Sequence, residues 1–148
     1  MGYQALYKLK DYKETFVFEK EHPKELRWDD RYKIYMLTEE PKCQGIWLKD
    51  GNQLIAEALL TWNSDNIVHI SGFTVLPSHR NKGVGYLIID KVVEWAFNSN
   101  YKYLIGEARM GSSWHIFKTL GAEELYVHKN WGKSNEDYVS FKLELRWQ

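Results

Sequence analysis

The middle of the chain alternates between apolar runs and short polar clusters in the pattern of consecutive β-strands. Residues 44–48 and 53–62 are apolar runs that flank a polar turn containing Asp50-Gly51. Asp-Gly between two such runs is a strong hairpin signal, because glycine supplies the positive φ that the tight turn requires. A second polar cluster, 63–66, leads into the β-branched run 67–76. The pattern predicts three antiparallel strands joined by short turns.

After this region the hydrophobic period changes from the two-residue repeat of a strand to the three- and four-residue repeat of a helix. The residues that follow the helical spacing are Gly85, Ile88, Ile89, Val92, Trp95 and Ala96. They form one apolar stripe, and the residues between them are polar or charged. This stripe predicts a helix that packs on a core.

The last third of the chain alternates strand and helix patterns. Residues 101–108 predict a strand, and 112–120 predict a short helix that Gly121 ends. Residues 123–128 and 138–145 predict two further strands joined by a polar segment. The order of elements predicts one α+β (mixed α/β) domain over the whole chain, 1–148, with a mostly antiparallel sheet and flanking helices.

The first 43 residues give weaker patterns. Residues 5–9 predict a strand, 12–18 predict the opening of a helix, and 32–37 predict an apolar segment that docks on the core. Between them, residues 19–30 are strongly charged and predict a solvated connection. In this connection Trp28-Asp29-Asp30 is a candidate site for a cationic amine, because an aromatic face and two carboxylates both attract positive charge.

Composition narrows the class of protein. The 148 residues carry 20 Lys+Arg and 20 Asp+Glu, so the formal net charge is zero. A protein that binds nucleic acid usually carries an excess of positive charge, which this chain does not have. No apolar run approaches the roughly 18 residues of a membrane span. The single cysteine, Cys43, cannot form an internal disulfide, which favours a reducing compartment. We expect a cytoplasmic monomer or homodimer without nucleic-acid or membrane partners.

The segment from Val75 to Tyr86 carries the clearest chemistry. A strand ends, a polar loop follows, and Gly83 and Gly85 open the amphipathic helix. The first turn of a helix has unpaired N–H groups and a partial positive charge, so it attracts anions. Glycines let phosphate oxygens approach the backbone closely, and Arg80 and nearby Lys82 add positive charge. The segment predicts a pyrophosphate-binding loop.

Two other phosphate motifs match this segment less well. The P-loop of nucleotide triphosphatases requires Gly-Lys-Ser/Thr, which the chain does not contain. The dinucleotide fingerprint requires a third glycine, and Ile88 occupies that position. It also requires a glycine turn directly after the strand, whereas six residues intervene here. Glu107 lies about twenty residues further on, as that fingerprint requires, so a dinucleotide-binding protein remains an alternative.

The hexapeptide Arg80-Asn81-Lys82-Gly83-Val84-Gly85, placed after an antiparallel meander, resembles the Arg-x-x-Gly-x-Gly signature of the GNAT acetyltransferase superfamily. The resemblance runs from about residue 44 to residue 145, because the predicted elements follow the family's order. It implies the GNAT-like acyl-CoA N-acyltransferase fold, in which the central sheet is splayed at the cofactor cleft. The run 114–122 also resembles small phage-encoded members of this superfamily.

The resemblance implies acetyl transfer from acetyl-CoA, as cosubstrate, to an amine of a small molecule or a protein, in a ternary complex. It places the pantetheine arm along the backbone of Phe73, Thr74 and Val75, with an N–H near Phe73 stabilising the oxyanion. The residues whose backbone would hold the pyrophosphate are Asn81, Lys82, Gly83, Val84, Gly85 and Tyr86. A non-catalytic CoA-binding protein of the same fold, structural or inhibitory, is an alternative.

The short helix departs from the family's pattern. Many members carry Asn, Ala and Tyr along this helix, and counting back from Gly121 places Met110, Ser113 and Phe117 at those positions. The family's tyrosine commonly protonates the leaving thiolate, which phenylalanine cannot do. Tyr126 is a candidate replacement for this acid.

Two residues are candidates for the base that takes the amine's proton. His69, which strand alternation would place on the same face as Phe73, can take up a proton near neutral pH. Glu107 ends the next predicted strand, where it is either the base or an anchor for the amine. His115 and His128 are expected on the surface, and the histidines show no metal-ligand spacing, so no metal is expected.

Overall fold

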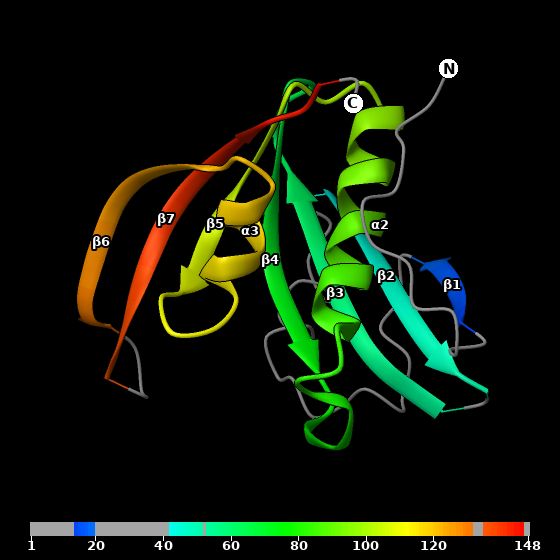
Figure 1. Ribbon diagram of the computed structural model, residues 1–148. Coiled ribbons are helices and arrows are strands. Elements are labelled where there is room, and N and C mark those ends of the chain that lie inside the picture. Colours follow the sequence, from blue (N-terminus) through cyan, green and yellow to red (C-terminus); the bar gives the residue numbers. More distant parts are fainter. Residues whose placement is uncertain (1–13, 20–41, 52, 132–134, 147–148) are drawn as a thin grey trace.

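The computed structural model describes residues 14–19, 42–51, 53–131 and 135–146, with side chains from Gln44 onward. In this part of the chain seven strands form one sheet, in the order β1-β2-β3-β4-β5-β7-β6 (Figure 1). The strands are β1 (Glu14–Glu19), β2 (Lys42–Asp50), β3 (Gln53–Trp62), β4 (Ile67–Val75), β5 (Tyr103–Arg109), β6 (Glu123–Trp131) and β7 (Glu136–Glu144). The helices are the short 3₁₀ turn η2 (Pro77–His79), α2 (Val84–Asn98) and α3 (Trp114–Thr119). The mixed, mostly antiparallel fold expected from the sequence is confirmed.

The predicted meander is present as β2, β3 and β4, which pair antiparallel in sequence order. Gly51 has a φ of 60° in the turn between β2 and β3, as the Asp-Gly signal requires. Gly121 likewise has a φ of 93° directly after α3, where it ends the helix in the left-handed conformation.

The expectation of a helix at residues 12–18 is wrong, because Glu14–Glu19 is strand β1 and pairs antiparallel with β2. The segment Thr15-Phe16-Val17-Phe18 is made of β-branched and aromatic residues, which favour a strand once an edge is available for pairing. The expectations for residues 5–9, 20–30 and 32–37, including the Trp28-Asp29-Asp30 site, lie outside the described residues.

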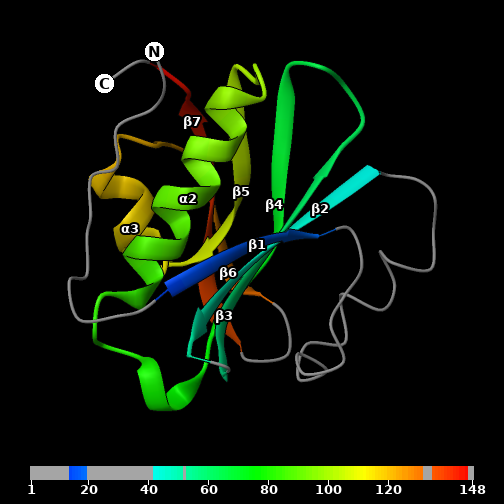
Figure 2. The same ribbon diagram turned by 90° about the vertical axis from the view of Figure 1, so that its right-hand side faces the viewer.

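Both helices pack on the same side of the sheet, α2 over β2, β3 and β4, and α3 beside β7 (Figure 2). The predicted apolar stripe faces this sheet, and Ile88, Ile89 and Val92 are fully buried in it. They contact the inward side chains of the meander, such as Ala58 and Leu60. The main core therefore lies between the helices and the sheet, and side chains on the other face of β2 and β3, such as Trp47 and Glu57, are also fully buried.

The sheet divides between β4 and β5. These two parallel strands pair over only four residues each, from Ile67↔Tyr103 to Ile70↔Gly106. Beyond that point residues 72–75 pair with β3 on one side, and residues 107–109 pair with β7 on the other. Figure 1 shows the carboxyl ends of β4 and β5 lying apart. The expected splayed sheet is thus present.

A β-bulge changes which face of β4 each side chain occupies. Leu60 pairs with Ile70 but Leu59 pairs with Gly72, so Ser71 is an extra residue without a register partner. Each side chain after the bulge therefore lies on the face opposite to the one that simple alternation predicts. Consequently His69 and Phe73 lie on opposite faces, contrary to the expectation that they share one.

Gly106 lies at the branch point, and its lack of a side chain permits the close approach of its neighbours. A Cβ on Gly106 would lie 2.6 Å from Cγ2 of Ile70 and 3.1 Å from Cζ of Phe141. Gly106→Ala should lower the free energy of unfolding by about 1–3 kcal/mol through overpacking, measured by urea denaturation. Gly111→Ala is the matched control, because nothing lies within 4 Å of its added Cβ. Equal stabilities of the two variants would contradict this account of the branch point.

Candidate active site

A cleft of about 1440 Å³ occupies the space where β4 and β5 separate. Its lining comes from the end of β4, the loop that precedes α2, the end of β5, and α3 with the turn before it. The predicted site residues that line it are Phe73, Thr74, Val75, Arg80, Asn81, Gly83, Gly85, Tyr86 and Glu107. Among the predicted residues, Lys82, Val84, His69 and Tyr126 are outside this lining.

The loop before α2 has the backbone shape of an anion-binding turn. Asn81 and Gly83 both have left-handed φ values, of 60° and 82°. Alternation of right- and left-handed residues turns successive N–H groups toward one point, where they form an anion-binding concavity. Gly83 is also the N-cap residue of α2, whose first turn contains no acidic side chain. The N–H groups of this turn and of the start of α2 are therefore a candidate anion site.

Arg80 is tied back to the end of β4. Its Nε donates a hydrogen bond to the carbonyl oxygen of Val75 at 3.0 Å. The next residue, Leu76, donates its N–H to the carbonyl of Ile55 on β3 at 2.8 Å. These two bonds fix where the loop leaves the sheet, so Arg80 contributes to the shape of the loop as well as to its charge.

Gly85 allows α2 to approach the cleft closely. A Cβ at this position would lie 3.0 Å from Cδ1 of Ile116 and 3.4 Å from Cζ of Phe73, and both of these side chains line the cleft. The second glycine of the motif therefore has a packing role between helix, strand and α3. The sequence placed Gly85 in the apolar stripe of this helix and at the approach of phosphate, but it did not predict the contacts with Phe73 and Ile116.

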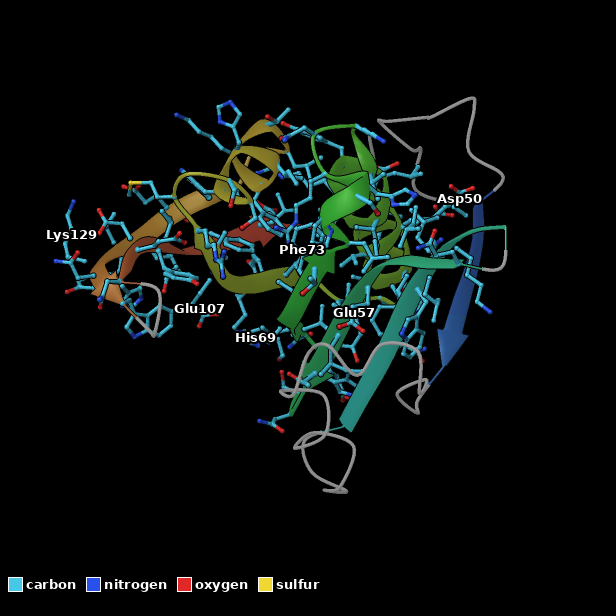
Figure 3. All side chains as sticks on the ribbon, turned by 90° about the horizontal axis from the view of Figure 1, so that it is seen from below. Asp50, Glu57, His69, Phe73, Glu107 and Lys129 are labelled. Carbon is cyan, nitrogen blue, oxygen red and sulfur yellow. The ribbon has the colours of Figure 1, made fainter. Side chains whose placement is uncertain are left out.

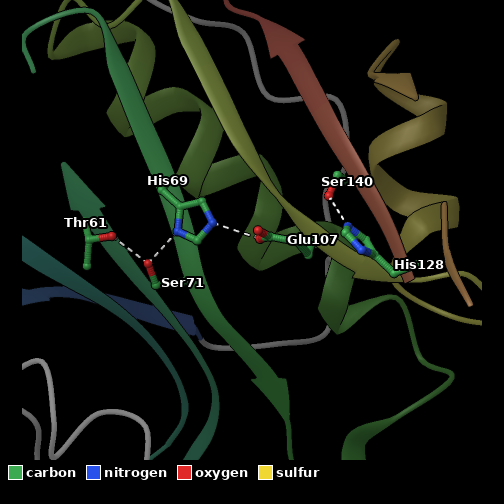
Figure 4. A network of polar contacts seen from close by, with 6 residues as sticks. All are labelled: Thr61, His69, Ser71, Glu107, His128 and Ser140. Carbon is green, nitrogen blue, oxygen red and sulfur yellow. Dashed lines mark hydrogen bonds and ion pairs between the residues drawn. The ribbon is translucent and has the colours of Figure 1, made fainter. Parts of the chain in front are cut away.

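A chain of hydrogen bonds crosses the branch point on the face away from the helices (Figure 4). His69 Nε2 lies 2.8 Å from Glu107 Oε2, and His69 Nδ1 lies 2.7 Å from Ser71 Oγ. Ser71 Oγ in turn lies 2.5 Å from Thr61 Oγ1. Figure 3 shows His69 and Glu107 next to each other, with Phe73 on the helix side of β4. The structure thus brings both candidate bases into direct contact, which the sequence did not predict.

The hydrogen bond from His69 lowers the pKa of the Glu107 carboxyl below its ordinary value of 4.5. Partial burial opposes this shift, and the positive charges that His69 and His128 can carry add to it. Both side chains of the pair remain about one-third exposed, with 32% for His69 and 35% for Glu107. Glu107 is therefore an ionised carboxylate that faces the cleft near neutral pH.

Phe117, at the position of the family's acid, and Tyr126, the candidate replacement acid, occupy different environments. Phe117 is 2% exposed and stacks on Phe141 with ring centroids 4.2 Å apart, at the inner wall of the cleft. Tyr126 is 63% exposed on β6, where its ring makes an edge contact with His128. The cleft does not include Tyr126. The residue at the family's acid position therefore serves packing, and Tyr126 lies away from the cleft.

The sequence reasoning missed several polar side chains of the site. The hydroxyl of Tyr138 accepts a hydrogen bond from Nε of Arg109 at 3.0 Å, and both residues line the cleft. Arg109 also forms an ion pair with Glu136. Glu57 does not line the cleft, but it is fully buried and pairs in register with Thr74, which does. Only strand register brings these residues together, so no local sequence signal could have found them.

Two structural features bear on other classes of function. Within residues 14–19, 42–51, 53–131 and 135–146, no group of three or more His, Cys, Asp or Glu side chains could hold a metal ion. In the same described part of the chain, none of the helices has the length and apolar character needed to span a membrane.

The divided sheet, the glycine-opened helix and the cleft between them define the acyl-CoA N-acyltransferase fold. Residues 5–131 match the sequence profile of the acetyltransferase (GNAT) family, and the chain belongs to this family. Comparison with curated protein sequences finds no match.

Solved structures of the same fold match most of the chain. The ribosomal-protein-S18-alanine N-acetyltransferase from Escherichia coli superposes with a TM-score of 0.72 at 14% identity, over 90% of this chain and 96% of that one. Ard1 from Thermoplasma volcanium gives 0.71 at 13% identity, over 88% and 98%. A GNAT family acetyltransferase from Elizabethkingia anophelis with acetyl-CoA bound gives 0.62 at 19% identity, over 88% and 98%.

Removing His69 should raise the pKa of the Glu107 carboxyl toward its ordinary value, because the largest cause of the lowering is their hydrogen bond. NMR of the carboxyl carbon against pH in His69→Ala measures this shift. A carboxyl whose pKa is lower in the folded state than in the unfolded state stabilises the protein at pH values above its ordinary pKa. This stabilisation is lost as the pH falls through the pKa of the folded state. In His69→Ala the free energy of unfolding should therefore depend less on pH in the acid range than it does in the wild type.

Asp137 is the internal control for this titration. Its pKa is lowered by the backbone N–H of Asn130 and by Lys129, neither of which involves His69. The Asp137 titration should therefore be the same in wild type and variant. A Glu107 carboxyl that titrates identically in both proteins would refute the assigned hydrogen bond.

Proposed function

We propose that the protein is an N-acetyltransferase that moves an acetyl group from acetyl-CoA to a primary amine of a small molecule or a protein. The observation that carries this proposal is one cleft that joins the freed edge of β4, the Gly83 turn and the ionised Glu107. The backbone N–H groups at one end of the cleft suit a phosphate-bearing acetyl donor. The carboxylate at the other end suits a cationic acceptor.

The chain offers CoA two kinds of backbone contact. Residues Phe73, Thr74 and Val75 pair with β3 on one side, and on the other side the strand has separated from β5. A pantetheine arm with its amide groups can lie along this free edge like an added strand. The N–H groups between Asn81 and Tyr86 then receive the pyrophosphate. The Elizabethkingia anophelis structure, a similar fold with acetyl-CoA bound, supports acetyl-CoA as the ligand.

The acceptor amine approaches from the face that carries His69 and Glu107. The Glu107 carboxylate attracts the cationic ammonium form, and the His69–Glu107 pair takes up the proton that the amine loses on attack. An N–H of β4 near Phe73 stabilises the negative charge that develops on the carbonyl oxygen. Transfer is direct, from donor to amine within a ternary complex.

A non-catalytic CoA-binding protein is the second candidate function. The observation that favours it is the packing of Phe117 on Phe141 at the position of the family's acid, with Met110 at the position of its asparagine. In this case the cleft would bind CoA tightly, and no amine would be acetylated at any pH.

Acetyl-CoA or CoA should raise the melting temperature, and NAD should leave it unchanged. A ligand present at about 100 times its dissociation constant adds about 2.7 kcal/mol to the free energy of unfolding, which is easily detected in a thermal melt. Stabilisation by NAD without stabilisation by CoA would instead favour the dinucleotide-binding alternative.

Gly85→Glu should abolish the shift with CoA, because its carboxylate lies where an anion approaches the start of α2. Gly85→Ala is the matched control for packing. It adds only the Cβ that contacts Ile116 at 3.0 Å and carries no charge. CoA binding that survives in Gly85→Glu, or is lost equally in Gly85→Ala, would count against a pyrophosphate site at this turn.

Glu107→Gln and His69→Ala should lower the turnover number by about 100- to 10,000-fold while the affinity for CoA holds, because loss of a general base has this effect. Higher pH should partly restore the rate by deprotonating the amine in solution. Steady-state kinetics with a panel of amines, together with CoA titrations, measure both quantities.

Glu144→Gln is the matched control for the loss of a carboxylate. Glu144 is exposed, lies on β7 opposite Tyr103 and pairs with Arg146, at the end of the sheet away from the cleft. Full activity of both His69→Ala and Glu107→Gln would mean that this pair is not the base. Tight CoA binding without transfer to any amine would favour the non-catalytic candidate.

A further inference from the structure

The departing thiolate of CoA needs a proton, and the residue at the family's acid position cannot supply it. Phe117 has no hydroxyl, and Tyr126 lies outside the cleft. We propose that the hydroxyl of Ser71 protonates the leaving thiolate and is itself resupplied with a proton by His69. This assignment rests on the proposed acetyl transfer, and it adds to that proposal a catalytic residue and a proton path.

The bulge places Ser71 where this role requires it. Ser71 follows the last β4–β5 pair, Ile70↔Gly106, and precedes the free edge of β4 along which the thioester arm is proposed to lie. It has no register partner on β3, and it is one of the residues that line the cleft. A bulge commonly re-aims a side chain in this way next to an active site. The hydroxyl is therefore near both the thioester and the base.

The hydrogen bonds of Ser71 have a direction that suits proton donation. The Glu107 carboxylate can only accept, so Nε2 of His69 is the donor in that bond. When His69 is protonated, Nδ1 also donates, and Ser71 Oγ accepts at 2.7 Å. The Ser71 hydrogen then goes either to Thr61 Oγ1, 2.5 Å away, or to an acceptor in the cleft. In the neutral form Nδ1 accepts the Ser71 hydrogen instead, while Thr61 donates to Ser71 Oγ.

The proposed step balances in atoms and charge. The amine nitrogen forms the new C–N bond, the C–S bond breaks, and the electron pair of that bond goes to sulfur. The Ser71 hydroxyl gives its proton to sulfur, and Nδ1 of His69 gives a proton to Ser71 Oγ. The acetylated nitrogen gives its extra proton to Glu107. The His69–Glu107 pair therefore holds the same number of protons before and after the step, and the products are a thiol and an amide.

Tyr138 is one of several other hydroxyl-bearing residues that line the cleft, with Thr74, Tyr86, Ser112 and Ser113. Its oxygen accepts a hydrogen bond from Arg109, and its ring lies 5.2 Å from that of Trp131. Tyr138 lies on β7, and the hydrogen bond recorded for its hydroxyl connects it to Arg109 rather than to His69. Ser71 is preferred because it is bonded directly to a group that can resupply its proton.

Three variants test the role of the hydroxyl. Ser71→Ala should lower the turnover number for amine acetylation by about 100-fold, in the range typical of a lost proton donor, with CoA affinity unchanged. Ser71→Thr retains a hydroxyl at this position and should retain most of the activity. Thr61→Val removes the other bond to Ser71 and leaves the Ser71–His69 bond, so it should have a much smaller effect than Ser71→Ala.

The pKa of Glu107 distinguishes proton donation by Ser71 from a role in which Ser71 only positions His69. If Ser71 only oriented His69, Ser71→Ala would also weaken the His69–Glu107 bond and raise the pKa of Glu107, as His69→Ala does. Under the proposal the Glu107 pKa in Ser71→Ala stays low while turnover falls. Phe117→Tyr supplies a second readout, because a tyrosine acid should restore more activity to Ser71→Ala than it adds to the wild type.

Several results would overturn the assignment while leaving acetyl transfer intact. One such result is full turnover in Ser71→Ala. Another is a rise in the Glu107 pKa that accompanies the loss of turnover in Ser71→Ala. A third is a loss of turnover in Tyr138→Phe that equals the loss in Ser71→Ala. A mass increase of one acetyl group on Ser71, after mixing with acetyl-CoA alone, would make Ser71 a nucleophile instead. Absence of amine acetylation by the wild type would remove the proposed function, and this assignment with it.

Discussion

The separation of β4 from β5 after four paired residues is the constraint on which the rest of the structure depends. Peptide groups of a strand need partners, so a strand that leaves its neighbour offers a free edge to a ligand or to water. The branch is narrow, because Gly106 touches Ile70 and Phe141 without space for a Cβ. The chain leaves β4 at this divided end and returns through α2, which brings the Gly83 turn to the mouth of the cleft.

The bulge at Ser71 is the second determinant of the site. After the bulge the side chains of β4 lie on the opposite face of the sheet. Phe73 therefore packs toward the helices, whereas His69 lies on the other face with Thr61. From there His69 reaches Glu107 across the branch, and the two strands that diverge are joined by one charged hydrogen bond. The same contact that links the two halves of the sheet therefore also lowers the pKa of the Glu107 carboxyl in the cleft.

On the wall of the cleft opposite β4, phenylalanine at position 117 affects both the packing of α3 and the supply of a proton. Phe117 stacks on Phe141, and Trp114 contacts the same ring with centroids 6.2 Å apart. This apolar cluster attaches α3 to β7 and stabilises the arm of the sheet that carries Glu107. A hydroxyl at Phe117 would have to be accommodated within that cluster. A proton donor on β4 avoids this conflict, because Ser71 lies where the strand is irregular and polar.

The sequence by itself determined the order of the elements from residue 44 onward, the hairpin at Gly51 and the helix that opens at Gly83, because each depends on local hydrophobic period or on glycine. It failed at residues 14–18, where pairing with β2 decides the conformation. The facing of His69, its bond to Glu107 and the contact between Arg109 and Tyr138 were decided only by the tertiary structure. These depend on strand register and on one bulged residue, and both are set by contacts between segments far apart in the chain, which no local pattern encodes.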